Sequence, residues 1–310
     1  MKEFNSRFKS EVSSKIPLLN MVTRFVLRRK GKQMRPLFVF LSSRLTGEIT
    51  ESTYTAASLI ELMHTATLVH DDVVDESNER RGTFSVNALW KSKVAVLFGD
   101  YLLARGLLLA VEKKDYDLLE IVSNASREMS EGELLQIQKS RSLNIDMDTY
   151  YEVIRKKTAS LIASCTACGA KAAGAGQEVV DRVYEMGIQI GMAFQIKDDL
   201  FDYQPRGLTG KPTGNDIKDK KFTLPLIYAL NQADPPKRRT IIRKIKNGNR
   251  SQHVVNEVIQ FVTDMGGIDF AVSKMQSYKS AAMEILYSFP ESPSRNSLRD
   301  LVEYTVSRKK

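Results

Sequence analysis

Apolar residues recur every three or four positions along most of the chain, with polar and charged residues between them. This period matches one face of an amphipathic α-helix, whereas a half-buried strand would alternate apolar and polar positions. No segment shows that alternation, so the pattern predicts helices and no strand. One or two helices are expected before residue 30, one from about residue 37, and others over residues 50–76, 94–113, 118–137, 148–175, 179–203, 223–233, 238–246, 253–265, 268–289 and 294–309.

Composition favours one large helical domain. The chain has 310 residues, of which 42% are hydrophobic, with only 9 prolines and 17 glycines. This hydrophobic content can fill a large core, and the length does not by itself require a division into domains. The segments least typical of helices, 206–215 and 233–237, are short enough to connect helices. We therefore predict a single all-α domain over residues 1–310.

A group of carboxylates ends the predicted helix of residues 50–76, where Asp71, Asp72 and Asp75 form a DDxxD motif. Residues four apart share a helix face, so Asp71 and Asp75 point the same way. Two carboxylates form a surface of hard oxygens suited to Mg²⁺, with the other coordination positions left to water and phosphate. Arg80 and Arg81 follow, and a guanidinium group can grip two phosphate oxygens at once.

The same spacing occurs again at Asp198, Asp199 and Asp202, at the end of another predicted helix. A single acidic triplet on a helix is usually a solvated face. Two copies, each ending an apolar helix and each followed by basic residues, favour a metal site instead. Opposed to each other, the two motifs would hold metal ions between them and clamp a diphosphate.

A basic turn precedes the helix that begins near residue 37. Residues 31–36 read Gly-Lys-Gln-Met-Arg-Pro, so Lys32 and Arg35 lie at a helix N-terminus. Free backbone N–H groups and the helix dipole add to the positive charge of these side chains. The turn is therefore a candidate phosphate site.

Taken in order, these segments resemble the trans-polyprenyl diphosphate synthases, the head-to-tail prenyltransferases, and especially their long-chain, octaprenyl-type members. The resemblance runs from about residue 30 to the C-terminus and implies an isoprenoid-synthase helical bundle around a central active-site cavity. It also implies a homodimer. Besides the basic turn and both acidic motifs, the matching residues are His64, Arg80-Arg81-Gly82, Glu131-Gly132-Glu133 with Gln136, Lys157-Thr158, Gln195, and Asp219-Lys220-Lys221.

The resemblance also implies roles for these residues. Without it, His64 would be interpreted as a core residue or a cap, and Lys157 as a solvent-facing cation. All six aspartates of the two motifs would bind metal, with about three Mg²⁺ ions per active site and Mn²⁺ as an alternative. Isopentenyl diphosphate would be bound by Gly31, Lys32, Arg35, His64 and Arg81, and the allylic diphosphate by Arg80, Lys157, Thr158, Gln195, Lys211 and Lys221. Catalysis would depend most on Asp71, Asp75, Arg80, Lys157, Asp198 and Lys221.

The expected reaction condenses isopentenyl diphosphate with allylic diphosphates to give a long all-trans polyprenyl diphosphate, the precursor of a quinone side chain. A short-chain farnesyl or geranylgeranyl diphosphate synthase is the main alternative. A class I terpene cyclase typically has an Asn/Ser/Glu triad in place of the second motif, and a squalene-type synthase has acidic pairs of different spacing. A non-catalytic partner subunit is expected to have lost one acidic motif, whereas both are whole here.

Product length is predicted from the residues that precede the first motif. Short-chain members of the resembling family carry large aromatic side chains four and five residues before the first aspartate. Here those positions are Thr67 and Ala66, with Met63 below them, so a growing chain can pass. Leu59 lies about 18 Å from Asp71 along the helix axis. This depth predicts a product of about octaprenyl length, with neighbouring lengths left open.

Net charge changes the expected partners little. A value of +9 suggests nucleic acid, but the basic residues are spread along the chain and no nucleic-acid fold signature accompanies them. We therefore expect no nucleic-acid partner. The clusters 28–30 and 308–310 could attract an anionic membrane surface during product handover, or serve as ordinary surface charge.

The two cysteines, Cys165 and Cys168, form a lone CxxC without the βαβ context of a redox pair or the further ligands of a zinc site. We expect them to pack in the core. The first residues lack the apolar segment of a signal peptide. The most apolar stretch, residues 94–111, contains Asp100 and Arg105, which argues against a membrane span. The sequence therefore predicts a cytoplasmic protein.

Overall fold

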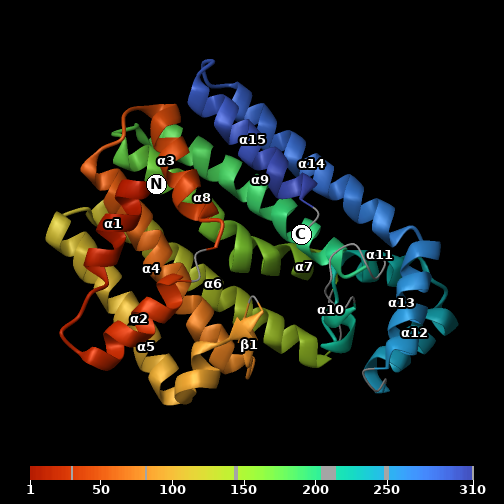
Figure 1. The fold of residues 1–310 in the computed structure, drawn as a ribbon. Coiled ribbons are helices and arrows are strands. Elements are labelled where there is room, and N and C mark those ends of the chain that lie inside the picture. The colour runs from red at the N-terminus through yellow and green to blue at the C-terminus, as the bar shows by residue number, and fades with distance from the viewer. Residues whose placement is uncertain (29–30, 81, 143–145, 204–213, 248–250, 309–310) are drawn as a thin grey trace. The chain divides into compact units, whose positions relative to one another are not determined.

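The computed structural model describes residues 1–28, 31–80, 82–142, 146–203, 214–247 and 251–308 (Figure 1). Almost all of these residues are helical, which confirms the predicted all-α class. They form two compact units. The first unit comprises residues 1–126 and 164–184, and the second comprises residues 127–163 and 185–310. The single domain over residues 1–310 stays a prediction, and each unit is described by itself.

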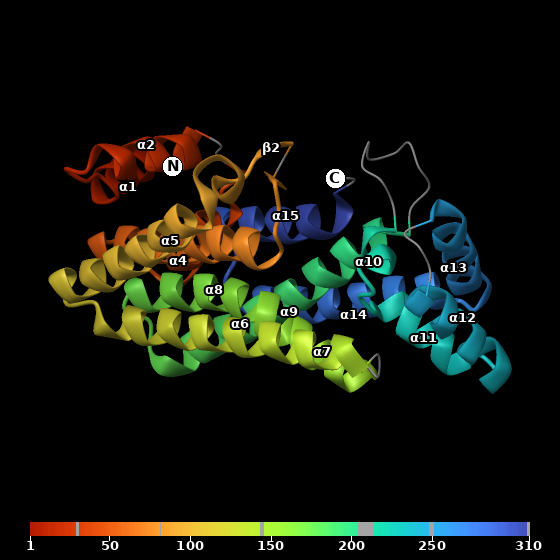
Figure 2. The ribbon, with the colours of Figure 1, turned by 90° about the horizontal axis from the view of Figure 1, so that it is seen from below.

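The first unit is built around α4 (Glu51–Val74), whose neighbours are α3 (Met34–Thr46) and α5 (Val86–Lys113). Figures 1 and 2 both show α4 and α5 side by side. Thr50 begins α4 with a reciprocal cap, because its hydroxyl accepts the N–H of Thr53 and the Thr53 hydroxyl accepts the N–H of Thr50. Most of the face that α4 turns inward consists of small or aliphatic residues with no exposed surface, such as Ala56, Ile60 and Ala66.

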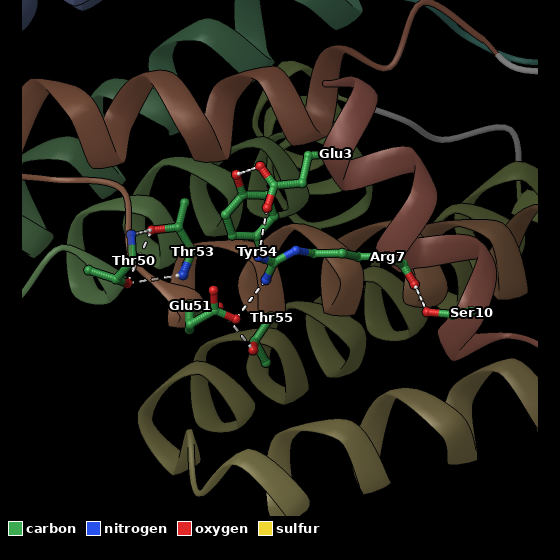
Figure 3. Close-up of polar contacts among 8 residues, drawn as sticks. All are labelled: Glu3, Arg7, Ser10, Thr50, Glu51, Thr53, Tyr54 and Thr55. Carbon is green, nitrogen blue, oxygen red and sulfur yellow. Dashed lines mark hydrogen bonds and ion pairs between the residues drawn. The ribbon is translucent and has the colours of Figure 1, made fainter.

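Two N-terminal helices, α1 (Lys2–Glu11) and α2 (Pro17–Arg28), complete this side of the first unit. A polar network joins α1 to the first turn of α4 (Figure 3). Arg7 donates to Glu3 and to Glu51, both at 2.6 Å, and its guanidinium lies 4.1 Å from the centre of the Tyr54 ring. The Tyr54 hydroxyl donates to Glu3 at 2.9 Å. Phe25 of α2 packs edge-on against Trp90 at the start of α5.

The expectation of no strand was wrong at one place. Between α4 and α5 lies an antiparallel hairpin of β1 (Glu79–Arg80) and β2 (Thr83–Phe84), in which Glu79 pairs with Phe84. Gly82 has φ of +72°, which a tight turn requires and other residues rarely adopt. Strands of two residues are too short to show alternation, so the hydrophobic pattern could not reveal them.

Helix α5 also begins earlier than predicted. It starts at Val86, where the Ser85 hydroxyl accepts the N–H of Ala88, rather than near residue 94. Lys91, with φ of 70°, interrupts its helical geometry. The residues before this break lack the continuous apolar period of those after it, which explains the late predicted start.

The second unit contains α7 (Met147–Ile154), the π-helical turn η1 (Arg155–Ala159), α10 (Asn215–Lys218), α11 (Leu224–Gln232), α12 (Pro235–Asn247), α13 (Gln252–Asp264), α14 (Gly267–Tyr287) and α15 (Pro293–Ser307). Figure 2 shows α11, α12 and α13 gathered at one end of this unit. Tyr228 of α11 stacks on Phe270 of α14 with ring centres 4.1 Å apart. Gly267 permits α14 to approach α11 closely, since a Cβ at this position would lie only 2.3 Å from the Pro225 carbonyl oxygen.

Three helices have residues in both units: α6 (Tyr116–Ser142), α8 (Ser160–Ala172) and α9 (Gln177–Phe201). The single helix predicted over residues 148–175 is in fact α7, η1 and α8 in succession. Cys165 and Cys168 are buried on α8, which confirms their packing role. Burial raises the pKa of the Cys165 thiol to about 12, so it stays protonated and unreactive.

Candidate active site

The basic turn of the first unit has the predicted form. Gly31 and Lys32 precede α3, and Gln33 caps this helix in a left-handed conformation while its side chain is hydrogen bonded to Asn5 at 2.7 Å. Lys32 is exposed and Arg35 is half-buried in the first turn of α3. Both cations therefore lie at a helix N-terminus, where backbone N–H groups favour an anion. His64 lies on α4 and is buried.

The first acidic motif spans the end of α4. The N–H of Asp75 donates to the carbonyl of Asp71 at 2.8 Å, so the two residues remain in helical register and share a face. Asp75 is exposed and Asp71 is half-buried, whereas Asp72 is buried and its carbonyl accepts the N–H of Ser77. Asp71 and Asp75 are thus the accessible pair, and Asp72 supports the motif from inside.

His70, to which the sequence analysis gave no role, fixes the last turn of α4 to α5. Its Nε2 lies 3.2 Å from the Val96 carbonyl oxygen and 3.5 Å from a carboxylate oxygen of Asp100. A Cβ on Gly99 would lie 2.2 Å from this nitrogen, so glycine is needed for the ring to fit. The contact holds in place the helix end that carries Asp71 and Asp75.

In the second unit, a chain of hydrogen bonds runs from the buried Asp199 of the second acidic motif to η1. The Tyr150 hydroxyl donates to Asp199 at 2.6 Å, and the Gln195 amide donates to the other oxygen of Asp199 at 2.9 Å. The Gln195 oxygen accepts the Thr158 hydroxyl at 2.8 Å. Burial and the charge of Asp216 raise the pKa of Asp199 to about 7. Because Asp199 is buried and accepts both hydrogen bonds, it anchors the motif inside the protein and fixes the orientation of the Gln195 amide.

Asp202 has a different structural task. Its carboxylate accepts the backbone N–H groups of Asn215 at 3.0 Å and Asp216 at 2.6 Å, which joins α10 to the end of α9. Asp216 is a residue that sequence reasoning missed, because nothing in its spacing sets it apart from the charged residues around it. Burial and the neighbouring Asp202 raise the pKa of Asp216 to about 6. The positive charge of the exposed Lys221 lowers the pKa of Asp216. The backbone N–H of Lys221 also donates to the Asp216 carbonyl at 2.8 Å.

Asp198 is the accessible carboxylate of the second motif, with 39% of its side chain exposed, and it already holds a cation. Its partner is the guanidinium of Arg308, which follows the last residue of α15. This contact shows that the Asp198 position accepts positive charge.

The motif of Glu131, Gly132, Glu133 and Gln136 positions the two lysines of η1. Glu131 forms an ion pair with Lys156 at 3.2 Å, and Glu133 forms one with Lys157. Lys157 also donates to Gln136 at 3.4 Å. A Cβ on Gly132 would lie 2.9 Å from the Lys157 backbone nitrogen, so the glycine permits α6 to approach η1 closely. These contacts make the motif a set of acceptors for the two lysines.

The predicted site residues are thus collected in two sets. The first unit contains the basic turn, His64 and the first acidic motif, and the second unit contains Lys157, Thr158, Gln195, the second acidic motif and Lys221. Arg81 and Lys211 lie outside the described residues, and Arg80 is a residue of β1. Within the described ranges, no three His, Cys, Asp or Glu side chains form a preformed metal site. Mg²⁺ does not need one, because it usually keeps several waters and takes one or two carboxylates plus substrate phosphates.

The predicted length-determining residues lie on α4 in the first unit. Ala66 is fully buried and Met63 is 3% exposed, while the half-buried Thr67 donates its hydroxyl to the His64 carbonyl at 2.9 Å. No aromatic side chain occupies this stretch of the helix.

Comparison with known proteins identifies the class to which this fold and site belong. Residues 16–262 match the family model of the Polyprenyl synthetase family. The octaprenyl diphosphate synthase of Escherichia coli is 32% identical over 98% of this chain and 94% of its own length. The crystal structure of a decaprenyl diphosphate synthase from Rhodobacter capsulatus matches with a TM-score of 0.93 and 35% identity, covering 100% of this chain and 96% of that one. The structure of a geranylgeranyl pyrophosphate synthase from Bacteroides thetaiotaomicron matches with a TM-score of 0.84 and 38% identity, covering 99% and 95%.

The chain belongs to the polyprenyl synthetase family. It is accordingly an enzyme, a trans-prenyltransferase that elongates isoprenoid chains, as the resemblance of its motifs indicated. Enzymes of this family generally depend on Mg²⁺ and use isoprenyl diphosphates.

Proposed function

We propose that this enzyme condenses isopentenyl diphosphate with allylic diphosphates to make an all-trans product of about octaprenyl length, which supplies a quinone side chain. The observation that carries this proposal is the small, fully buried Ala66 on α4, together with Thr67 and Met63 on the same stretch. An aromatic ring at these positions would block a growing chain, and none is present. Solved structures named for decaprenyl and geranylgeranyl products share this fold, which supports a local origin of product length.

Isopentenyl diphosphate is assigned to the basic turn of the first unit. Lys32 and Arg35 at the N-terminus of α3 supply charge and backbone donors suited to a diphosphate, and Gly31, His64 and Arg81 complete the proposed set. The allylic diphosphate is assigned to Arg80, Lys157, Thr158, Gln195, Lys211 and Lys221. Lys157 is held in place by Glu133 and Gln136, so its ammonium is positioned before any substrate arrives.

The metal ligands are proposed to be Asp71, Asp75 and Asp198, with Asp72, Asp199 and Asp202 in supporting positions. The donor set fits Mg²⁺: hard carboxylate oxygens are accessible at the first three, and Asp198 already holds a guanidinium. When bound, about three Mg²⁺ ions, or Mn²⁺ as an alternative, would neutralise the charge that develops on the departing diphosphate.

The protein's own contribution to the chemistry is orientation and exclusion of water. The Thr158 hydroxyl donates its proton to Gln195, whose amide is fixed by Asp199, and it would turn this proton toward a phosphate oxygen when the allylic diphosphate binds. The aliphatic face of α4 supplies the dry wall that an allylic cation needs. No strong base is assigned to the last proton loss, and the departing diphosphate can accept that proton.

A homodimer is proposed from the outer face of α5. Leu97, Leu107 and Leu108 are each more than half exposed, and Val96 and Val111 are 40% and 47% exposed. Several large exposed apolar side chains on one helix are typical of an interface. Helix α5 is also long and apolar enough to cross a membrane, although 39% of its most apolar window is buried inside the protein. Light scattering should give the mass of a dimer for the wild type and a smaller mass for Leu108→Glu.

The cytoplasmic location and the absence of a nucleic-acid partner remain proposals. A peripheral membrane contact during product handover is proposed from the basic residues near the chain termini, although Arg308 itself is engaged with Asp198. Arg29, Lys30, Lys309 and Lys310 lie outside the described residues.

The proposed function is tested by incubating the enzyme with Mg²⁺, isopentenyl diphosphate and farnesyl diphosphate, and then sizing the dephosphorylated products. Products of about forty carbons are expected, from eight five-carbon units. Products that stop at farnesyl or geranylgeranyl diphosphate would support the short-chain alternative. Consumption of farnesyl diphosphate without isopentenyl diphosphate would indicate a cyclase.

A further inference from the structure

The end of α15 brings an arginine onto the second acidic motif. The Arg308 guanidinium forms an ion pair with Asp198, although the two residues are 110 positions apart in the sequence. The Arg308 side chain is only 13% exposed, which is unusual for an arginine that follows the last residue of a helix. Its Nε also donates to the Thr305 carbonyl at 3.2 Å, which ties the guanidinium to the last turn of α15.

Two aromatic rings of α9 hold the same guanidinium. It lies 4.0 Å from the centre of the Phe194 ring and 5.6 Å from that of Phe201. Phe194 and Phe201 lie four residues before and three after Asp198, so they flank the carboxylate on one face of α9. The three side chains form a fitted site for a cation, with negative charge at its centre and ring faces on both sides.

Positive charge is already gathered around Asp198. The Lys197 ammonium lies 5.2 Å from the centre of the Phe201 ring, and the Arg308 guanidinium lies 5.6 Å from the same ring centre. A divalent ion on Asp198 would add charge beside a guanidinium bound to the same carboxylate. Repulsion between them favours one cation or the other at this carboxylate.

We propose that Arg308 is a built-in cation that occupies Asp198 in the metal-free enzyme and that a metal ion must displace. Metal binding at the second motif and release of the end of α15 are then one exchange. The exchange keeps Asp198 ordered and charge-balanced before metal arrives, and it lowers the metal affinity of the second motif. The inference rests on the proposed role of Asp198 as a metal ligand.

The test measures Mn²⁺ binding to the full-length, substrate-free enzyme by electron paramagnetic resonance of the free ion. Arg308→Gln should bind Mn²⁺ at the second acidic motif about fivefold more tightly than the wild type does, because no guanidinium has to be displaced. Arg299→Gln is the control, because it removes an arginine of α15 that is paired with Asp300 instead. This control should change the affinity by less than about twofold.

Hydrogen exchange gives the second readout. Mn²⁺ should accelerate amide exchange over residues 302–307 in the wild type, whereas Arg308→Gln should exchange quickly with or without the ion. Thermal melting should show that all variants are folded. Arg308→Lys should bind Mn²⁺ with an affinity between those of the wild type and Arg308→Gln. An Arg308→Gln affinity equal to that of the wild type, or exchange in the wild type that does not respond to Mn²⁺, would overturn the inference.

Asp198→Asn separates this inference from the proposed function. If Asp198→Asn loses one Mn²⁺ site while Arg308→Gln binds like the wild type, Asp198 is a ligand and only the exchange is wrong. If Asp198→Asn binds Mn²⁺ like the wild type, the metal role of Asp198 fails, and the exchange fails with it.

Discussion

At the scale of single residues, the structure separates aspartates that the sequence presents as equals. Both motifs read DDxxD, yet Asp72 and Asp199 are buried, and Asp202 caps a short helix. Spacing on a helix predicts which carboxylates share a face, and Asp71 and Asp75 do. It cannot predict partners such as Tyr150 of α7 and Asp216 of α10, because spacing along one helix does not record contacts with other elements.

Tyr150→Phe should destabilise the protein and lower its turnover. The substitution leaves one oxygen of the buried Asp199 without its hydroxyl donor, a loss that costs about 1–3 kcal/mol. Tyr151→Phe is the matched control, because the Tyr151 hydroxyl makes no hydrogen bond to any described residue. Chemical denaturation of the two variants measures the difference. Equal free energies of unfolding would show that the Tyr150 hydrogen bond contributes nothing.

At the scale of elements, the hydrophobic period predicted most helices and their approximate bounds. It missed the hairpin of β1 and β2, the break at Lys91 and the π-helical turn η1. All three are local departures in backbone geometry whose causes lie elsewhere. In the case of η1, Gly132 of α6 and Gly191 of α9 each approach its backbone closely, and no local pattern near residue 157 announces them.

Gly191→Ala tests the packing of α9 on η1. A Cβ at this position would lie 2.4 Å from the Ala159 Cα, a backbone atom that cannot move aside cheaply. We expect a loss of about 1–3 kcal/mol in stability and weaker activity, because the Thr158–Gln195 hydrogen bond crosses the same contact. Gly176→Ala has nothing within 4 Å and should unfold like the wild type. A normal melting temperature for Gly191→Ala would mean that the two segments are not in close contact.

The network joining α1 to α4 predicts a dependence of stability on pH. Hydrogen bonds from Tyr54 and Arg7 lower the pKa of Glu3, and those from Arg7 lower the pKa of Glu51. A carboxyl group with a lowered folded-state pKa stabilises the fold above its unfolded pKa and loses that contribution as the pH falls through the folded pKa. Arg7→Gln should therefore melt below the wild type at pH 7, and the gap should narrow below about pH 4. A gap that does not change with pH would leave only the stacking of Arg7 on Tyr54 as its cause.

At the scale of the whole molecule, the ordered set of motifs predicted the family and the all-α class, and the comparisons confirm both. The sequence could not show that these motifs divide between two compact units. That division depends on contacts between segments far apart in the chain, which no local pattern records. The sequence also could not show that the end of α15 reaches the second motif.

Ala66→Phe should shorten the product. A ring at this fully buried position of α4 would stand where the growing chain must pass, so elongation should stop after the first condensations. Consumption of farnesyl diphosphate should persist while the longest products disappear. The exposed Val74 on the same helix provides the control, since Val74→Phe should leave product length unchanged. Unaltered product length in Ala66→Phe would mean that the growing prenyl chain does not pass Ala66.

The central claim is that both acidic motifs serve one reaction, and the turnover of three variants tests it most directly. Asp71→Asn and Asp198→Asn should each lower kcat by orders of magnitude at saturating Mg²⁺ while the protein stays folded. The double variant should be little worse than either single variant, because groups that act as a unit show strongly non-additive losses. Near-normal turnover in either single variant, or losses that multiply in the double variant, would contradict the account.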